Sequence, residues 1–436
     1  MDINLQLREQ LWIFTRFPFN LAIQRKPKFD AKLNILFNDS LESLNNLIFE
    51  VINLHSLKKI LFLVHLVILF SCKTDTKEKV LEITEDGTSF LEYAKGFEIQ
   101  HFGELTVLKI HSPWPKSDKS YTYALVSREN AATMTFDKDE FDAIIITPIN
   151  KLVVTSTTHL PALELLGVEK TLIGFPGTDY ISSEGFRKRV NTDGIRELGK
   201  NEGINTEVLL ELHPDLVVGF GIDGNNKTFE TIEKSGIPVI YNGDWVETSP
   251  LAKAEWIKFF GVLYNKEKQA DSIFYDIKTD YLEAKKLASQ VVKRPSVLSG
   301  AMHKDIWYLP SGTSAEAQLL KDANVDYLWK DTTEKGSLSL NFETVFNKAQ
   351  NADIWISPSY YSSLEALKKA NEHYTKFEAF QTKNVYSFVN KTGETGGVLY
   401  FELGMARPDL VLKDLVKVCH PELLKDYEPY FFKKLD

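Results

Sequence analysis

A long amphipathic segment in the middle of the chain constrains the fold more than any other feature. Residues 266–292 place apolar side chains at a helical period, and these are Ala270, Ile273, Phe274, Ile277, Tyr281, Ala284, Leu287 and Val291. A helix of about 26 residues extends about 39 Å at 1.5 Å per residue. Together with a shorter helical piece at residues 250–264, it predicts a rod that traverses two lobes.

Short apolar segments alternate with helical segments on both sides of this rod. Before it, we expect strands at residues 151–155, 171–174, 215–219 and 238–241, with helices at 161–166, 205–212 and 226–235. After it, we expect strands at 296–299, 325–329, 353–356 and 384–388, with helices at 315–321, 341–348 and 363–370. Such alternation predicts an α/β fold, with parallel sheets in two Rossmann-like lobes joined by a single long helix.

Charge and cysteine content exclude several classes of protein. The chain of 436 residues carries a net charge of −9, which disfavours nucleic-acid binding because phosphate neutralisation dominates that affinity. Two cysteines, Cys72 and Cys419, exclude a disulfide scaffold and a cysteine-built zinc site. The phosphate-loop, His-Glu-x-x-His and Gly-x-Ser-x-Gly motifs do not occur, so we predict no catalytic residues and no metal site.

The region before residue 148 is typical of an exported protein. Lys58 and Lys59 precede an apolar run of 11 residues and the tetrapeptide Leu69-Phe70-Ser71-Cys72, which resembles a lipobox. We therefore predict a signal peptide at 56–71, with Cys72 as a lipid anchor; a buried core helix with a chance cysteine is the alternative. Residues 1–55 fit this reading poorly and are either a real extension or the result of a misassigned start. A tether and a β extension, with a hairpin of strands at 105–111 and 120–126, are expected over 72–147.

One glycine motif matches the outline of a dinucleotide fingerprint. Gly219-Phe220-Gly221-Ile222-Asp223-Gly224 follows an expected strand, and Asp244 comes 20 residues after the last glycine. A helix should start inside such a run so that its N-terminus faces the pyrophosphate. Because the expected helix begins later, we favour a flexible loop at a strand's carboxyl end.

Several segments together resemble the periplasmic-binding family for iron-siderophores, haem and cobalamin, the substrate-binding components of ABC importers. They are 213–219, 237–241, 259–273, 307–314, 319–323, 407–415 and 420–423. The resemblance covers roughly residues 148–436 and implies a lobe at 148–249, connecting helices at 250–293 and a second lobe with C-terminal helices at 294–436. A helical connector is stiff, so closure on a ligand should be small.

The resemblance also implies a docking role for one acidic residue on each lobe. Glu207 and Glu343 occupy matching positions in a weak internal repeat, in which Asn and Glu open a short helix before an Asp-initiated strand. We expect both to meet arginines on the permease. An ordinary role at a helix start, where Asn caps and Glu suits the dipole, is compatible with docking.

The ligand is expected in a cleft between the lobes, over the carboxyl ends of the strands. Aromatic and hydroxyl side chains in the loops there, one of which is expected at residues 302–314, suit a large chelate. The candidate ligand-binding residues are Thr157, His159, Arg187, Arg189, Trp245, Trp307, Ser311, Tyr360 and Tyr361. The arginines would pair with an anionic chelate, and His159 or Tyr360 would ligate haem iron.

These expectations combine into one function. We predict a non-enzymatic, monomeric lipoprotein, at the cell surface or facing the periplasm, that captures an iron(III)-siderophore-type chelate and passes it to ABC permease subunits. It would be held at the membrane by its lipid anchor, bind no nucleic acid and need no cofactor, the iron or cobalt being part of the ligand. A cobalamin- or haem-binding protein of the same family is the alternative. From other classes, a Rossmann-type dinucleotide-binding enzyme and an anchored adhesin or assembly factor stay open.

Overall fold

The computed structural model describes residues 87, 91–132, 140–201, 203–224 and 226–436. The chain divides into two compact units, Met1–Glu78 and Lys79–Asp436, and every described residue lies in the second. The predicted extension at 1–55, the signal segment at 56–71 and the anchor Cys72 therefore lie outside the described residues.

An N-terminal sheet precedes the two lobes. β1 (Phe97–Phe102), β2 (Leu105–His111) and β3 (Ser120–Ser127) are antiparallel neighbours, α4 (Arg128–Ala131) follows, and β4 (Ala143–Thr147) pairs parallel to β3. β2 and β3 form the hairpin that the sequence predicts. Phe97 packs on Trp256, with ring centroids 4.6 Å apart, so this sheet shares a core with the first lobe.

The first lobe is built on a five-stranded parallel sheet in the order β11-β10-β5-β6-β7. Its strands are β5 (Leu152–Val154), β6 (Leu172–Phe175), β7 (Arg196–Glu197), β10 (Leu216–Phe220) and β11 (Val239–Asn242). Its helices are α5 (Leu160–Leu165), α6 (Glu184–Val190), α7 (Thr206–Leu212) and α8 (Lys227–Lys234), with short turns η1 (Thr157–His159), η2 (Glu169–Thr171), η3 (Thr178–Tyr180) and η4 (Asp244–Val246). A small hairpin, β8 (Gly199–Lys200) and β9 (Gly203–Ile204), follows β7. From β5 the chain runs outward through β6 and β7, and it later returns to the other side of β5 to form β10 and β11. The strand order therefore reverses between β5 and β10, which makes this boundary a topological switch point.

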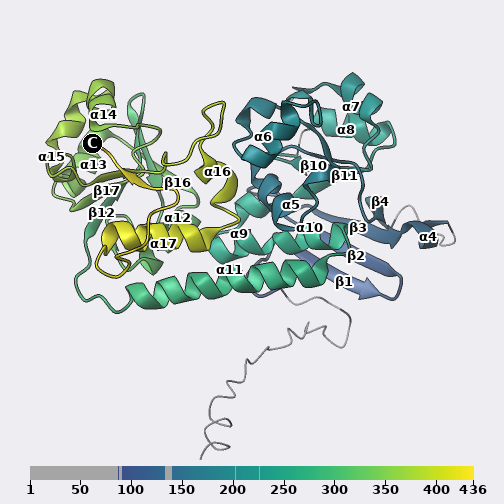
Figure 1. Ribbon diagram of the computed structural model, residues 1–436, viewed down its shortest axis with the longest axis horizontal. Helices are drawn as coiled ribbons and strands as arrows, with labels where there is room; N and C mark the ends of the chain where they lie inside the picture. Colours follow the sequence, from purple (N-terminus) through teal and green to yellow (C-terminus); the bar gives the residue numbers. More distant parts are fainter. Residues whose placement is uncertain (1–86, 88–90, 133–139, 202, 225) are drawn as a thin grey trace, which may run out of the picture. The chain divides into compact units, whose positions relative to one another are not determined.

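The connector consists of α9 (Pro250–Glu255), α10 (Ile257–Leu263) and α11 (Glu267–Ala288), and α11 has 22 residues. Figure 1 shows α11 extending from beneath the elements of one lobe to those of the other. It ends earlier than the predicted residue 292, because Val292 is 96% exposed and Pro295 follows closely. The predicted fold, two α/β lobes joined by one long helix, is confirmed.

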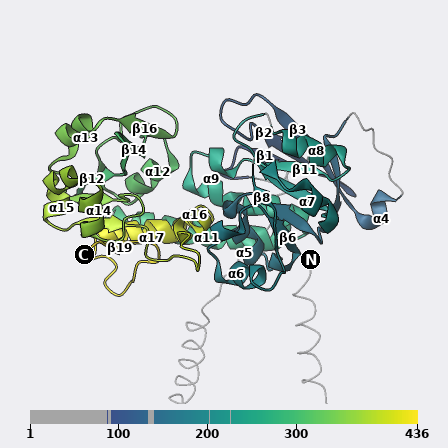
Figure 2. The same cartoon turned by 90° about the horizontal axis from the view of Figure 1, so that it is seen from above.

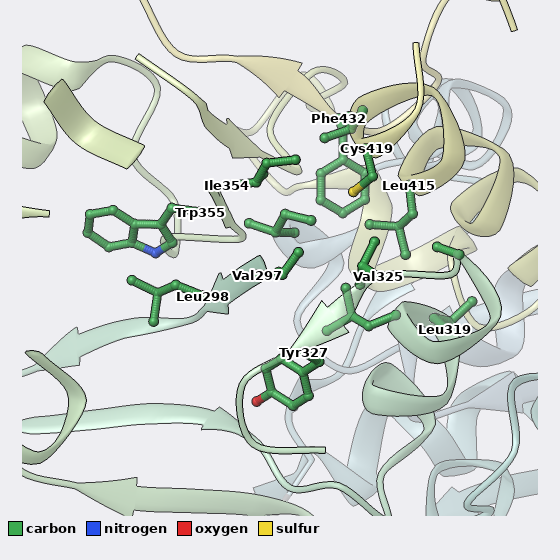
Figure 3. Packing of buried hydrophobic residues seen from close by; sticks show 14 of the residues in the cluster. Val297, Leu298, Leu319, Val325, Tyr327, Ile354, Trp355, Leu415, Cys419 and Phe432 are labelled. Carbon is green, nitrogen blue, oxygen red and sulfur yellow. The ribbon is translucent and has the colours of Figure 1, made fainter. Parts of the chain in front are cut away.

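The second lobe repeats the arrangement with the strand order β15-β12-β17-β18-β19. Its strands are β12 (Ser296–Ser299), β15 (Asp326–Tyr327), β17 (Ile354–Ile356), β18 (Val385–Ser387) and the antiparallel β19 (Lys433–Lys434). Its helices are α12 (Ala315–Asp322), α13 (Phe342–Ala349), α14 (Leu364–Ala370), η5 (Glu372–Lys376), α15 (Glu378–Gln381), α16 (Leu399–Leu403) and α17 (Pro408–Cys419). The switch point here lies between β12 and β17. Side chains from β12, β17, α12 and α17 interlock in its core (Figure 3).

A second sheet in this lobe corrects one prediction. The segment 302–314, expected to be a loop, contributes most of an antiparallel sheet of β13 (Ala301–His303), β14 (Ile306–Pro310) and β16 (Ser337–Leu340). In β14, Trp307 and Leu309 point inward while Ile306 and Tyr308 are exposed. This two-residue alternation is the mark of a half-buried strand.

The lobes also meet directly. α16 of the second lobe contacts η1 and α5 of the first, and α17 packs along α11. Figure 2 shows α9 and α16 between the elements of the two lobes. None of the described helices combines the length and apolar composition needed to cross a membrane.

Candidate functional site

A cavity of about 1160 Å³ lies between the two lobes. At the switch point of the first lobe it is lined by Thr155 and Thr157, which follow β5, and by Phe220, which ends β10. The second lobe contributes Tyr360 and Phe401. We call this space the interlobe cavity. It occupies the position expected of a ligand site in open α/β sheets, at the carboxyl ends of the strands.

A second cavity of about 570 Å³ lies at the switch point of the second lobe. Ser299 at the end of β12 and Ser357 after β17 line it, together with Met302, Tyr308 and Tyr361. We call it the C-lobe cavity. Phe401 of α16 lines both spaces. The adjacent residues Tyr360 and Tyr361 therefore face different cavities, and the two switch points together form a cleft with two compartments.

Two polar side chains that line the interlobe cavity are acceptors held in defined positions, Glu197 and Asn201. Glu197 accepts hydrogen bonds from the amides of Gly177 and Gly199 and from the amide and hydroxyl of Thr178. Partial burial opposes its ionisation, but these bonds together outweigh burial and lower the pKa of Glu197. The side-chain oxygen of Asn201 is buried and has no hydrogen-bond partner among the described residues.

Glu402 holds the lobes together at the edge of this cavity. Its carboxylate accepts the backbone N–H of Ser182 at 2.6 Å and that of Ser183 at 3.0 Å, both from the first lobe. Burial raises the pKa of Glu402 to about 7, the negative charge of Glu164 raises it further, and the two amides oppose the shift. The Ser183 hydroxyl donates to Glu164, so the serine pair lies between two carboxyl groups.

Further contacts close the same seam. The Thr395 hydroxyl donates to the backbone oxygen of Asp179 at 2.6 Å, and the Asn191 amide donates to Glu394 at 3.0 Å. Gly393 lies so close that an added Cβ would stand 2.6 Å from the Ser182 backbone. The loop before α16 is therefore seated on the first lobe.

Three predicted ligand residues line the cleft. Thr157 and Tyr360 face the interlobe cavity, and Tyr361 faces the C-lobe cavity. Tyr360 is 64% exposed, with its ring 5.5 Å from that of Phe401. Their contact with a ligand stays a prediction.

The two predicted tryptophans do not line either cavity. Trp307 is wholly buried, stacks on Trp355 at 5.5 Å and donates its indole N–H to the Ser299 carbonyl. Its assignment to the ligand site was wrong, because it faces inward on β14. Trp245 packs against Phe220 at 5.4 Å and so supports a lining residue from behind.

The predictions for His159 and Ser311 were also wrong, because both residues are fully buried. The His159 ring packs on Phe260, and burial lowers its pKa to about 3, which keeps the imidazole neutral. The Ser311 hydroxyl donates to the Glu334 carbonyl and so fixes a turn.

Both predicted arginines serve the first lobe's own structure, which overturns their assignment to an anionic ligand. Arg187 is buried and donates to the Thr178 carbonyl at 2.6 Å. Arg189 donates to the carbonyl oxygens of Glu169, Lys170, Leu172 and Gly194. The Arg189 guanidinium, satisfied by carbonyls, has few donors left for a ligand. The Nε of Arg187 has no hydrogen-bond partner among the described residues, but Arg187 lines neither cavity.

The sequence analysis missed several lining residues. The largest are Phe175, Tyr180, Phe220 and Phe401, and the charged ones are Asp179, Glu197, Lys200 and Glu402. Those at 175–200 follow strand ends, so their position on loops was a usable signal. For Phe401 and Glu402 the sequence holds no such signal, because the residues that they contact lie far away in the chain.

The two glutamates of the repeat are exposed at helix starts, and their role in docking stays a prediction. Glu207 and Glu343 are exposed in the first turns of α7 and α13, whose N-caps are Asn205 and Asn341. Each Asn side chain accepts an amide N–H of its helix, at 3.2 and 2.8 Å. The caps thus carry the helix-start role and leave the carboxylates facing solvent.

The glycine motif does not form a dinucleotide site. α8 begins at Lys227, after the glycines, and Gly219 is tight against Phe229, since a Cβ there would lie 2.6 Å from the ring. Asp244 is fully buried, and burial raises its pKa. It cannot reach a ribose.

Comparison with known proteins shows which family has a sequence model that matches this chain. The sequence model of the periplasmic binding protein family matches residues 152–391, more than half of the chain. The match runs from β5 to the loop before α16 and therefore includes both switch points. It leaves the N-terminal sheet outside.

Individual relatives agree with this match. An uncharacterized lipoprotein of Methanocaldococcus jannaschii is 27% identical over 306 residues, which are 68% of this chain and 71% of that protein. A periplasmic haem-binding protein of Pseudomonas aeruginosa superposes with a TM-score of 0.50 at 16% identity, over 66% of this chain and 98% of that one. A periplasmic solute-binding protein of Veillonella parvula gives 0.50 at 17%, over 65% and 84%. These two structures share the fold.

Proposed function

We propose a function from one premise: this chain belongs to the periplasmic binding protein family. Such proteins are the substrate-binding components of ABC importers and are not enzymes, so the dinucleotide-enzyme and adhesin alternatives fall away. We propose that the ligand is an iron(III) chelate of the siderophore type, captured in the cleft and delivered to a permease. Cobalamin or haem is the alternative ligand.

The observation that carries this proposal is the cleft at two facing switch points. Small-molecule sites usually occupy about 300–1,000 Å³. The interlobe cavity alone has about 1160 Å³, and the C-lobe cavity adjoins it at Phe401. A space of this size, with aromatic rings from both lobes, suits a large rigid chelate better than an amino acid or a sugar.

Delivery is proposed to use Glu207 and Glu343. Each is exposed at the first turn of a helix on its own lobe. Two carboxylates on separate lobes, fixed through a helical connector, would contact basic residues of the permease. Exposed ion pairs of this kind set register and association rate more than affinity. Anchoring through Cys72 belongs to the same proposal, and a monomer suffices because one chain builds the whole cleft.

Calorimetric titration of the full chain in mild detergent tests the proposal. The probes are ferric siderophores of several chemical types, cyanocobalamin and haemin. We expect saturable one-to-one binding of at least one iron(III) siderophore at micromolar concentration or below. Saturable binding of cyanocobalamin or haemin alone would move the assignment to that alternative. Failure of all the probes to bind would refute the chelate assignment.

A further inference from the structure

The ionisable side chains that line the interlobe cavity are mainly acidic. Asp179, Glu197 and Glu402 face Lys200, the single lysine in the lining, and none of the lining residues is an arginine. Hydrogen bonds from amides lower the pKa of Glu197 and so favour its charged form, whereas the buried Glu402 titrates close to neutrality. Asp179 is exposed at the mouth, and its backbone oxygen accepts the Thr395 hydroxyl.

The charged residues that line the C-lobe cavity do not reverse this acidic balance. Glu316 and Lys253 both line this cavity. The Lys253 ammonium donates to the Trp245 carbonyl at 3.1 Å and keeps its positive charge. Taken together, the cleft presents four carboxyl groups and two lysines.

Neither of the arginines nearest to the cleft lines either cavity. Arg189 donates to carbonyl oxygens of the first lobe. Arg187 donates to the Thr178 carbonyl and lies 3.9 Å from the Glu394 carboxylate, and its Nε has no hydrogen-bond partner among the described residues. Recognition of catecholate or carboxylate oxygens commonly relies on bidentate arginine. An anionic chelate would here meet carboxylates without that compensation.

Other lining groups favour a ligand with hydrogen-bond donors and some positive character. The buried Asn201 oxygen is an acceptor without a partner among the described residues. A buried acceptor left unpaired is costly, so a ligand N–H or O–H would be stabilising there. The faces of Phe220, Tyr360 and Phe401 carry negative electrostatic potential, which attracts cations and tolerates neutral rings.

We propose that the cleft selects a neutral or cationic metal chelate with N–H or O–H groups on its periphery and discriminates against anionic chelates. This inference rests on the proposed function and narrows its ligand class. Asp179 is the specificity-determining residue, since it is the exposed carboxylate at the mouth. Like charges placed against a ligand exclude wrong partners as effectively as attractive contacts favour the right one.

The test compares four probes on the full chain by calorimetry at pH 7.5. A cationic ferric trihydroxamate with a free amine and neutral cyanocobalamin represent the favoured class. An anionic ferric tris-catecholate and haemin represent the other. We expect the tightest-binding favoured probe to exceed both anionic probes by roughly tenfold or more in affinity. Tighter binding of the tris-catecholate or of haemin would overturn the charge preference while leaving chelate capture intact. If none of the four probes bound, both the charge preference and chelate capture would be refuted.

A charge-reversal variant at Asp179 tests whether this residue, at the mouth of the cleft, sets the charge preference. Asp179→Lys should weaken the cationic probe and strengthen the anionic one, each by about tenfold, because its charge changes by two units beside the ligand. Asp179→Asn, which alters little sterically, should move both affinities in the same directions by less. Glu283→Lys on the exposed face of α11 makes the same change in net charge away from both cavities. Equal effects of Asp179→Lys and Glu283→Lys would show that total charge, not the mouth of the cleft, sets the preference.

Discussion

The Glu402 carboxylate of the second lobe accepts the Ser182 amide of the first lobe at 2.6 Å, across 220 residues of sequence. The bond is buried, and Ser183 adds a second one at 3.0 Å. Lobe contact in this protein thus depends on a group that titrates close to neutrality, since burial raises the pKa of Glu402 to about 7. Proton uptake and lobe contact are therefore linked.

This linkage predicts a pH-dependent stability. The pKa of Glu402 is higher in the folded chain than its ordinary value of 4.5, so its contribution is fully present below pH 4.5 and is lost as pH rises through 7. Relative to Glu402→Gln, the wild type should lose about 3 kcal/mol of unfolding free energy between pH 4.5 and 8. Urea denaturation of both proteins at several pH values measures the difference, with Glu283→Gln, on the exposed face of α11, as the control. A difference that does not vary with pH would contradict a shifted carboxyl group.

His159 predicts the opposite dependence. Its pKa is about 3 because the imidazole is buried, below the ordinary 6.5, so its stability contribution is present above pH 6.5 and is lost as pH falls toward 3. Relative to His159→Leu, the wild type should lose about 3 kcal/mol between pH 6.5 and 4.5. Above pH 7 the variant should be at least as stable, since neither ring nitrogen has a hydrogen-bond partner in the part of the chain that the structure describes. Acid denaturation monitored by circular dichroism checks this, and an unchanged acid midpoint would rule it out.

Two aromatic residues that looked alike in the sequence should behave differently. Tyr360→Ala should change stability by no more than about 0.5 kcal/mol, because the side chain is largely exposed, and should weaken chelate binding about tenfold. Trp307→Ala should cost about 3–5 kcal/mol, because it empties a core position. The milder Trp307→Phe should leave chelate affinity unchanged. Chemical denaturation and calorimetry on each variant separate the roles, and reduced affinity in Trp307→Phe would return that residue to the site.

Docking is tested by charge reversal on both lobes. Glu207→Lys combined with Glu343→Lys should abolish chelate uptake by cells and leave affinity in calorimetry within twofold, because both residues are exposed outside the cleft. The matched control is Glu211→Lys with Glu365→Lys, which alters two other exposed glutamates, on α7 and α14. Loss of affinity in the first variant would assign these glutamates to the fold instead.

Periodicity could predict the lobes because it records which side of an element is buried. The connector, the strands at the centres of both sheets and the capped helices at Asn205 and Asn341 all follow from local pattern. Only part of the candidate site could be predicted from the sequence. Loop position singled out Thr157, Tyr360 and Tyr361, which do line the cleft.

The errors have two causes: contacts that no local pattern records, and one strand pattern that was overlooked. Whether Arg189 faces a ligand or four carbonyl groups of its own lobe depends on contacts of 5 to 20 residues in sequence that no composition reveals. Trp307 was assigned to a loop, although its alternation with Ile306 and Tyr308 was present in the sequence and marks a strand. Glu402 could not be found, since its partners lie about 220 residues away.

The backbone amides of residues 92–96, just before the N-terminal sheet, are all hydrogen-bonded to two glutamates that lie far away in sequence. The N–H groups of residues 92–94 donate to Glu255 of α9, and those of Lys95 and Gly96 donate to Glu247. Lys278 of α11 adds an ion pair with Glu92 at 2.6 Å. If the chain is anchored through Cys72 as proposed, a force transmitted along the chain to residues 92–96 would act on α9 and α11, on which both lobes pack. It would not act directly on the loops that line the interlobe cavity.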